Sequence, residues 1–125
     1  KAFDSSTGFT LPNSAVRSPD ASWVALERWT ALPPEQRRDG FAPICPDFVV
    51  ELRSPSDRLA DLKRKMREYV EQGARLGWLI DPTTRRVWIY RPGRDPEKLV
   101  DPKTLSGEDV LTGFVLELKP IFDEE

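Results

Sequence analysis

The chain has 125 residues, of which 38% are hydrophobic and 32% are charged, and its formal net charge is −2. This length suits one domain with its own hydrophobic core, and no apolar run approaches the roughly 18 residues that a membrane span needs. The acidic balance argues against a nucleic-acid-binding protein, although segment 58–75 is locally basic, with six Lys and Arg residues against three acids.

The side-chain types that the chain lacks narrow its possible chemistry. It has no His and a single cysteine, Cys45, which excludes an intramolecular disulfide framework, a zinc site of the usual ligands and Ser-His or Cys-His nucleophile pairs. Hydrolytic chemistry would have to use carboxylates, Lys, Tyr and a hard metal ion such as Mg²⁺ or Mn²⁺. Because no signal peptide is recognisable, we expect a cytoplasmic location and no membrane association.

The first third of the chain predicts little regular structure. Residues 1–19 are rich in Ser, Gly and Pro and indicate loops. The apolar run 23–26 predicts a strand with Asp20 at its entrance. Residues 28–45 form a connection in which 33–38 can make one helical turn.

Segment 47–53 predicts a strand that carries acids where a buried strand should have none. Side chains alternate between the two faces of a strand, so one face is expected to be core and the other to carry chemistry or salt bridges. The second face holds Asp47, Val49, Glu51 and Arg53. Because like charges on one face repel each other unless a cation lies near, the pattern favours a divalent metal ion.

The segment after this strand predicts a helix. Apolar residues recur at spacings of three and four over 59–72, as in an amphipathic helix. Ser56 or Asp57 can cap its start, and Gly73 can end it.

Two further strands follow, at 78–80 and 87–90, with a turn between them that makes a hairpin. The order strand, helix, strand over 47–81 predicts a right-handed parallel crossover. Weaker strands are expected near 99–100 and at 114–118. The fold class is therefore α/β, with a twisted mixed β-sheet and few helices.

Four segments together resemble a known family. Residues 17–23, 46–57, 65–69 and 77–82 have the order and spacing of the Uma-two family of proposed bacterial endonucleases, in the PD-(D/E)XK restriction-endonuclease-like superfamily. The resemblance implies a mixed sheet flanked by helices, a DNA substrate, and a homodimer. It also implies one domain over residues 1–125, which we expect to lack its natural N-terminal segment.

The resemblance further implies the site. Asp20 and Glu51 would hold Mg²⁺ (or Mn²⁺), and Lys65 would be the catalytic amine. The superfamily's lysine usually lies two residues after the second acid, where this chain has Arg53, a poor proton acceptor. The family's lysine lies instead on the following helix. Auxiliary roles are expected for Asp47, Arg53 and Tyr69.

The residues themselves support part of this assignment. Lys65 lies at the edge of the apolar stripe of its helix, one turn before Tyr69, so its stem can follow the core while its amine reaches the rim. The helix begins just past the carboxyl end of the acidic strand, where ligands bind in open α/β sheets.

Each of these residues also has a structural explanation. Asp20 can be a turn or cap residue, Glu51 can form a salt bridge, and Lys65 can be a solvated residue paired with Asp61. Tyr69 can simply pack in the core. Two other functions therefore stay open: a non-catalytic nucleic-acid- or protein-binding module of the same fold, and a structural domain whose acidic strand is neutralised by ion pairs.

Overall fold

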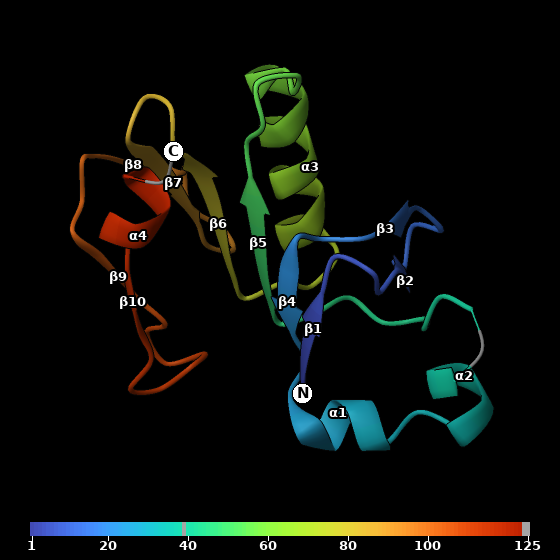
Figure 1. The fold of residues 1–125 in the computed structure, drawn as a ribbon. Coiled ribbons are helices and arrows are strands. Elements are labelled where there is room, and N and C mark those ends of the chain that lie inside the picture. Colours follow the sequence, from blue (N-terminus) through green and yellow to red (C-terminus); the bar gives the residue numbers. More distant parts are fainter. Residues whose placement is uncertain (39, 124–125) are drawn as a thin grey trace.

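The computed structural model describes residues 1–38 and 40–123, in which ten strands and four helices are found (Figure 1). The strands are β1 (Ala2–Asp4), β2 (Phe9–Thr10), β3 (Val16–Arg17), β4 (Ala21–Trp23), β5 (Phe48–Leu52), β6 (Leu76–Asp81), β7 (Arg86–Tyr90), β8 (Glu97–Val100), β9 (Thr104–Ser106) and β10 (Val115–Glu117). The helices are α1 (Leu26–Thr30), α2 (Pro34–Arg38), α3 (Leu59–Glu71) and α4 (Lys119–Phe122).

A mixed six-stranded sheet in the order β1-β4-β5-β6-β7-β8 forms the centre of the fold. Strands β5 and β6 are parallel and are joined by α3, while every other neighbouring pair in this sheet is antiparallel. The predicted crossover and the hairpin of β6 and β7 are thus confirmed. The mixed α/β fold class is confirmed with them.

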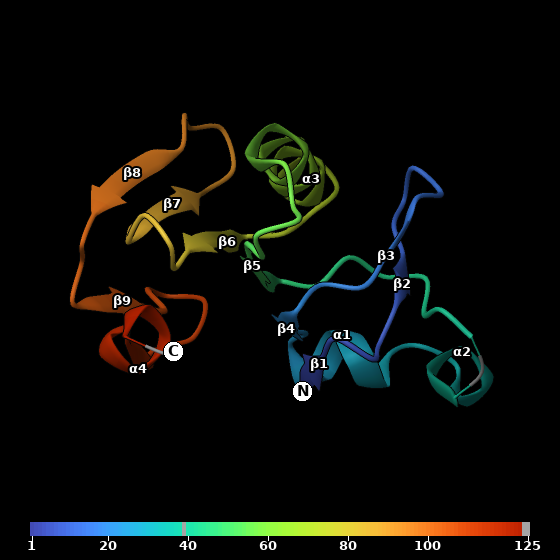
Figure 2. The same ribbon diagram turned by 45° about the horizontal axis from the view of Figure 1, so that its top comes forward.

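The sheet is covered on both faces. Helix α3 packs on one face, and the β9–β10 pair with α4 lies on the other (Figure 2). Val49 packs with Leu62 and Met66 beneath α3, whereas Phe48 and Val50 pack with residues of the opposite layer. The second face is therefore buried as well, yet the salt bridges expected there are found, at Asp47, Glu51 and Arg53. Its acids are surrounded by core, which makes any unpaired charge there costly.

The N-terminal part is more regular than the sequence predicts. Strand β4 lies earlier than the predicted 23–26, and the chain turns into helix α1 at Leu26. The reason is a distant residue, because the Asp47 carboxylate accepts a hydrogen bond from the Ala25 amide and pairs with Arg28 on α1. The predicted helical turn at 33–38 is confirmed as α2.

Helix α3 begins and ends close to its predicted bounds. Its cap differs from the prediction, since Arg58 occupies the N-cap position without a side-chain cap bond. Asp57 instead accepts hydrogen bonds from the amide and hydroxyl of Ser54, which closes the turn before the helix. Gly73 ends the helical segment with a φ of 130°, as expected for a residue that needs no Cβ.

In the C-terminal part, the strands predicted near 99–100 and 114–118 are found as β8 and β10. Strand β9 was not predicted; it pairs with β10 in a separate two-stranded sheet. None of the described helices is long and apolar enough to cross a membrane.

Candidate metal and catalytic site

Two acids from distant parts of the chain lie side by side at one end of the sheet. Asp20 immediately precedes β4, and Glu51 lies near the carboxyl end of β5. The antiparallel register pairs Ala21 with Val50, which places Asp20 beside Glu51. This proximity depends on a strand pairing between segments about thirty residues apart.

Crossed hydrogen bonds hold the two carboxylates in place. The Asp20 amide donates to Glu51 Oε1 at 3.1 Å, and the Leu52 amide donates to Asp20 Oδ2 at 2.7 Å. Each acid is thus positioned by the backbone next to the other acid. Glu51 is buried, with 3% of its surface exposed, whereas Asp20 is exposed to solvent. The pair therefore lies at the boundary between the core and the surface.

Helix α3 brings two more polar groups to Glu51. The Lys65 ammonium lies 3.4 Å from Glu51 Oε2, and the Tyr69 hydroxyl donates to the same oxygen at 3.4 Å. The Lys65 side chain is 38% exposed and so reaches solvent, while Tyr69 is fully buried. The structure therefore brings Asp20, Glu51, Lys65 and Tyr69 together.

The electrostatics of the site follow from burial. Loss of hydration raises the pKa of Glu51, and neither Lys65 nor the Asp20 amide fully offsets this effect. Burial and the nearby Glu51 carboxylate both raise the pKa of Tyr69, so its hydroxyl remains a hydrogen-bond donor at neutral pH. A divalent cation would therefore stabilise the ionised carboxylate of Glu51 more than Lys65 does alone.

Asp47 lies elsewhere. It precedes the first residue of β5, four residues from Glu51, which corresponds to about 13 Å along an extended strand. Its carboxylate pairs with Arg28 at 2.8 Å and with Arg75 at 3.2 Å. Two arginines neutralise this acid, and the expectation of one metal ion near both acids of the strand is wrong for Asp47.

Arg53 has a different neighbour from Glu51. Its guanidinium pairs with Asp81 at 2.9 Å and donates to the Asp57 carbonyl at 3.3 Å. Burial alone would raise the pKa of Asp81, but hydrogen bonds from Arg53 and Thr84 outweigh it and lower that pKa. Arg53 thus ties the segment before α3 to the end of β6.

Asp81 was not predicted as a site residue. It stands in one of the four family-like segments, and the sequence pattern indicates only a turn there. The informative signal is the burial of Asp81, which is 1% exposed. This burial becomes apparent only once β6 is placed in the centre of the sheet.

The donor chemistry of the site fits a hard divalent cation. Carboxylate oxygens are ligands that Mg²⁺ prefers, and this ion is commonly held by one or two carboxylates with water completing its shell. Asp20 Oδ1 accepts no hydrogen bond from any described residue, and Glu51 has a raised pKa that a cation would lower. Within residues 1–38 and 40–123, no group of three or more His, Cys, Asp or Glu side chains could hold a metal ion. Asp20 and Glu51 would need backbone or water oxygens as further ligands.

Comparison with known proteins agrees with this fold. The profile of the Uma2 family, described as "Putative restriction endonuclease", matches residues 1–119. A solved structure described as a putative nuclease belonging to DUF820, from Anabaena variabilis ATCC 29413, aligns with a TM-score of 0.83 and 23% identity. The alignment covers 98% of this chain and 68% of that one. The search of curated proteins found no match.

Proposed function

Because the chain belongs to the Uma2 family, we propose that it is a metal-dependent endonuclease that hydrolyses phosphodiester bonds in DNA. The observation that supports this proposal most directly is the convergence of Asp20, Glu51 and Lys65 at the rim of the sheet. Two acids and one amine with access to solvent are the groups that phosphodiester hydrolysis requires when no His is present.

Each residue has a distinct role in the proposed reaction. Asp20 and Glu51 would hold Mg²⁺ (or Mn²⁺), which when bound polarises a phosphoryl oxygen and lowers the pKa of a bound water. Lys65 lies at the solvent side of Glu51 and would stabilise the negative charge that accumulates on the phosphoryl oxygens. Tyr69 donates to Glu51 and orients its carboxylate. Arg53 and Asp47 support the fold around the site through their own ion pairs.

Nicking of supercoiled plasmid tests this proposal. The parent chain should nick plasmid in the presence of Mg²⁺ or Mn²⁺ and should stop when a chelator is added. Glu51→Gln keeps the size of the side chain but removes its charge, and should lower the rate by at least about 100-fold. Circular dichroism would check that the variant is folded.

The control for this experiment is Asp61→Asn, which removes an exposed acid of α3 that pairs with Arg64. It should cut at the parental rate. Parental nicking by Glu51→Gln would contradict the assignment of the site, and absence of nicking by the parent with either ion would contradict the nuclease proposal.

A second candidate function is a non-catalytic nucleic-acid- or protein-binding module of the same fold. The observation in its favour is that Lys65 already pairs with Glu51, while Arg53 occupies the usual lysine position and is engaged by Asp81. Such a module would bind a partner but would not nick plasmid with either ion.

We further propose that the protein acts in the bacterial cytoplasm as a homodimer. Two copies would present two reacting centres, and paired centres suit cleavage of both strands of a duplex.

A further inference from the structure

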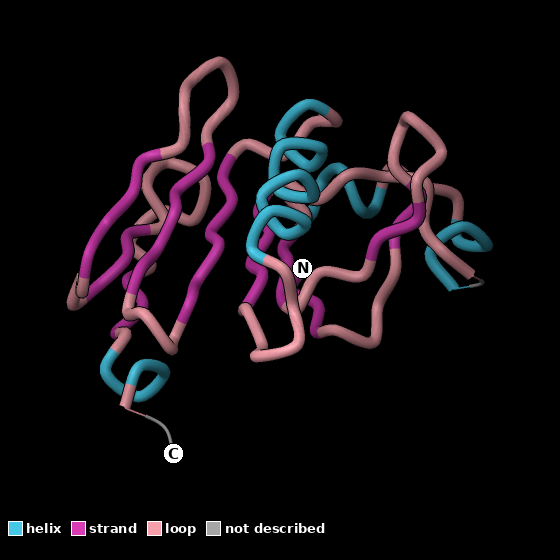
Figure 3. Tube along the Cα trace, turned by 90° about the horizontal axis from the view of Figure 1, so that it is seen from above, coloured by secondary structure: helices cyan, strands magenta, loops and turns pink. Residues whose placement is uncertain are grey.

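A hollow lies between α3 and the β7–β8 turn, and two lysines extend the same flank along Trp88; we call this surface the groove. Helix α3 lies between this hairpin on one side and the β2–β3 hairpin on the other (Figure 3). Lys63 and Lys65 are separated by about 200° around the helix, so Lys63 lies on the flank opposite the reacting centre. Arg67 lines both this groove and a hollow beside Lys65, so the two surfaces meet over α3.

Two lysines from different elements converge on one aromatic ring in this groove. The Lys63 ammonium lies 4.7 Å from the centroid of Trp88, and that of Lys98 lies 6.0 Å from it. Neither lysine forms an ion pair within the described part of the chain. Trp88 stabilises both ammonium groups by a cation-π interaction but does not cancel their mutual repulsion.

One step along the groove, two arginines share a hollow. Arg67 of α3 and Arg94 of the β7–β8 turn both line it, and neither is ion-paired within the described residues. Tyr90 forms part of the wall of the same hollow. The Tyr90 residue is 2% exposed, and its hydroxyl is buried without a hydrogen-bond partner among the described residues.

The unpartnered hydroxyl is informative because buried polar groups are nearly always satisfied. Burial raises the pKa of Tyr90, although the charge of Arg67 lowers it in part, so the hydroxyl stays protonated and can donate. A hydroxyl donor in a hollow that two arginines also line offers an anion both charge and a directed hydrogen bond.

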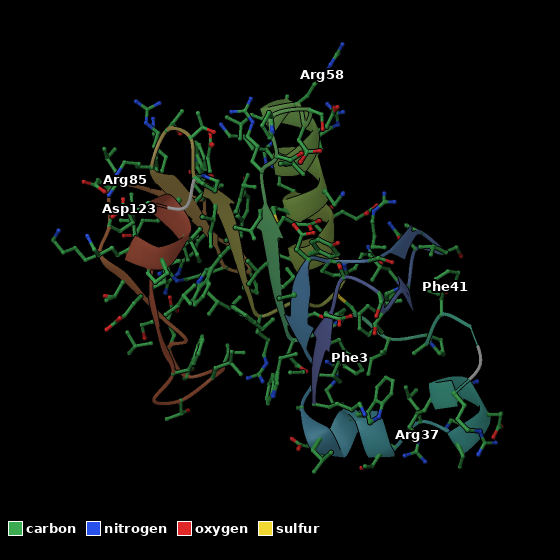
Figure 4. The ribbon with its side chains drawn as sticks, in the orientation of Figure 1. Phe3, Arg37, Phe41, Arg58, Arg85 and Asp123 are labelled. Atoms are coloured by element: carbon green, nitrogen blue, oxygen red, sulfur yellow. The ribbon has the colours of Figure 1, made fainter. Side chains whose placement is uncertain are left out.

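The acids of the hollow match the charge of Arg67 and Arg94, so the excess of positive charge comes from Lys63 and Lys98. Glu71 and Asp95 line the hollow, while Glu97 forms an ion pair with Arg91. Four cations of the groove form no ion pair with any residue that the structure describes: Lys63, Arg67, Arg94 and Lys98. Elsewhere the cations are often neutralised, as Arg85 is by Asp123, which lies beside it in Figure 4.

The residues of the groove lie in two pairs along α3 and β7. Lys63 and Arg67 are four residues apart on α3, which gives a rise of about 6 Å. Trp88 and Tyr90 are two residues apart on β7, which gives a rise of about 6.7 Å. The groove therefore presents cations at two successive positions, which suits a polyanion with charges along its length.

We propose that this groove binds the phosphate backbone of the DNA substrate, at a position that flanks the reacting phosphate and lies across α3 from Lys65. This inference rests on the proposed function, which identifies the polyanion as DNA. A helix is about 10 Å across with its side chains, so a duplex can contact both flanks of α3 at once.

Binding of a short labelled DNA duplex, followed by fluorescence anisotropy with a chelator present, tests the groove without cleavage. Two variants, Lys63→Gln/Lys98→Gln and Arg67→Gln/Arg94→Gln, each remove two charges. Each should weaken binding at least about 10-fold near 50 mM salt and reduce the slope of log K against log salt by about 1.8, the value for two phosphate contacts.

The control variant Lys103→Gln/Lys119→Gln removes the same charge from exposed positions outside the groove. It should change the slope by less than about 0.5. Tyr90→Phe should weaken binding about threefold while leaving the melting temperature equal or higher, because it removes an unsatisfied buried hydroxyl. A purely structural role of this hydroxyl would instead lower the melting temperature.

The outcomes separate this inference from the nuclease proposal. If the groove variants bind DNA like the parent, or no worse than the control, the proposal that the groove binds DNA is wrong, even when the parent nicks plasmid. If the groove variants lose binding while the parent fails to nick plasmid, the DNA-binding role of the groove is supported and the nuclease proposal is contradicted. Tight binding of polyglutamate that depends on the groove, with DNA binding unaffected, would overturn the inference in favour of an acidic protein partner.

Discussion

At the scale of single residues, the acids of this chain differ in how their charge is balanced. Asp47 contacts two arginines, and Asp81 contacts one arginine and a threonine hydroxyl. Among the described residues Glu51 has one cation, Lys65 at 3.4 Å, and burial raises its pKa. The balance of charge thus distinguishes two structural acids from the acid that suits a metal ion.

The structural role of Asp81 has a testable pH dependence. Its folded-state pKa lies below the ordinary value of 3.8, so its charge stabilises the fold above pH 3.8, and this contribution is lost as the pH falls through the folded-state value. Asp81→Asn should cost about 1–3 kcal/mol at neutral pH. Urea unfolding should show this difference shrinking in acid.

For comparison, Asp61→Asn at an exposed position should be nearly neutral in stability at both pH values. A stability difference for Asp81→Asn that does not change with pH would argue that the lost contact is not ionic.

At the scale of elements, the placement of Lys65 and Tyr69 depends on how closely α3 approaches β6. Gly77 of β6 lies under the helix, and a Cβ at this position would come within 2.7 Å of Met66 Cε and 3.2 Å of Val49 Cγ2. The absence of a side chain at Gly77 therefore permits the close packing that brings α3 over Glu51.

Gly77→Ala should consequently destabilise the fold by about 1–3 kcal/mol through overpacking. The cost should be smaller in a Met66→Ala background, where the nearest atom is gone, and a double-mutant cycle of unfolding free energies would measure this coupling. Strictly additive effects would contradict the proposed contact.

At the scale of the whole molecule, charge is distributed unevenly. The chain is acidic overall, yet the flank of α3 that faces β7 and β8 holds several cations that pair with no acid of the described chain. The opposite flank holds the candidate site. A net charge of −2 therefore does not describe the surface that a polyanion would meet.

Metal binding can be measured on the whole protein without DNA. If Asp20 and Glu51 hold Mn²⁺, titration should raise the melting temperature by several degrees, because about 2.7 kcal/mol of stabilisation is expected at 100 times the dissociation constant. Glu51→Gln should abolish the shift, and Asp61→Asn should retain it. A shift of equal size in Glu51→Gln would place the ion elsewhere.

Local sequence patterns were enough to predict the central elements of the fold. The strand around Glu51, the helix of Lys65 and the β6–β7 hairpin were predicted because periodicity, turn residues and a terminal glycine are properties of neighbouring residues. The family-like segments added Asp20, which its own neighbours indicate only as a turn or cap residue.

What only the tertiary structure decided depends on contacts between distant segments. The sequence does not show that both faces of β5 are covered, that Asp47 directs the turn into α1, or that Asp57 closes a turn instead of capping α3. The pairing of β4 with β5 sets Asp20 beside Glu51, and the approach of α3 sets Lys65 beside Glu51. These positions follow from strand register and helix packing, which depend on the burial energy of the whole sheet rather than on the preferences of any one segment.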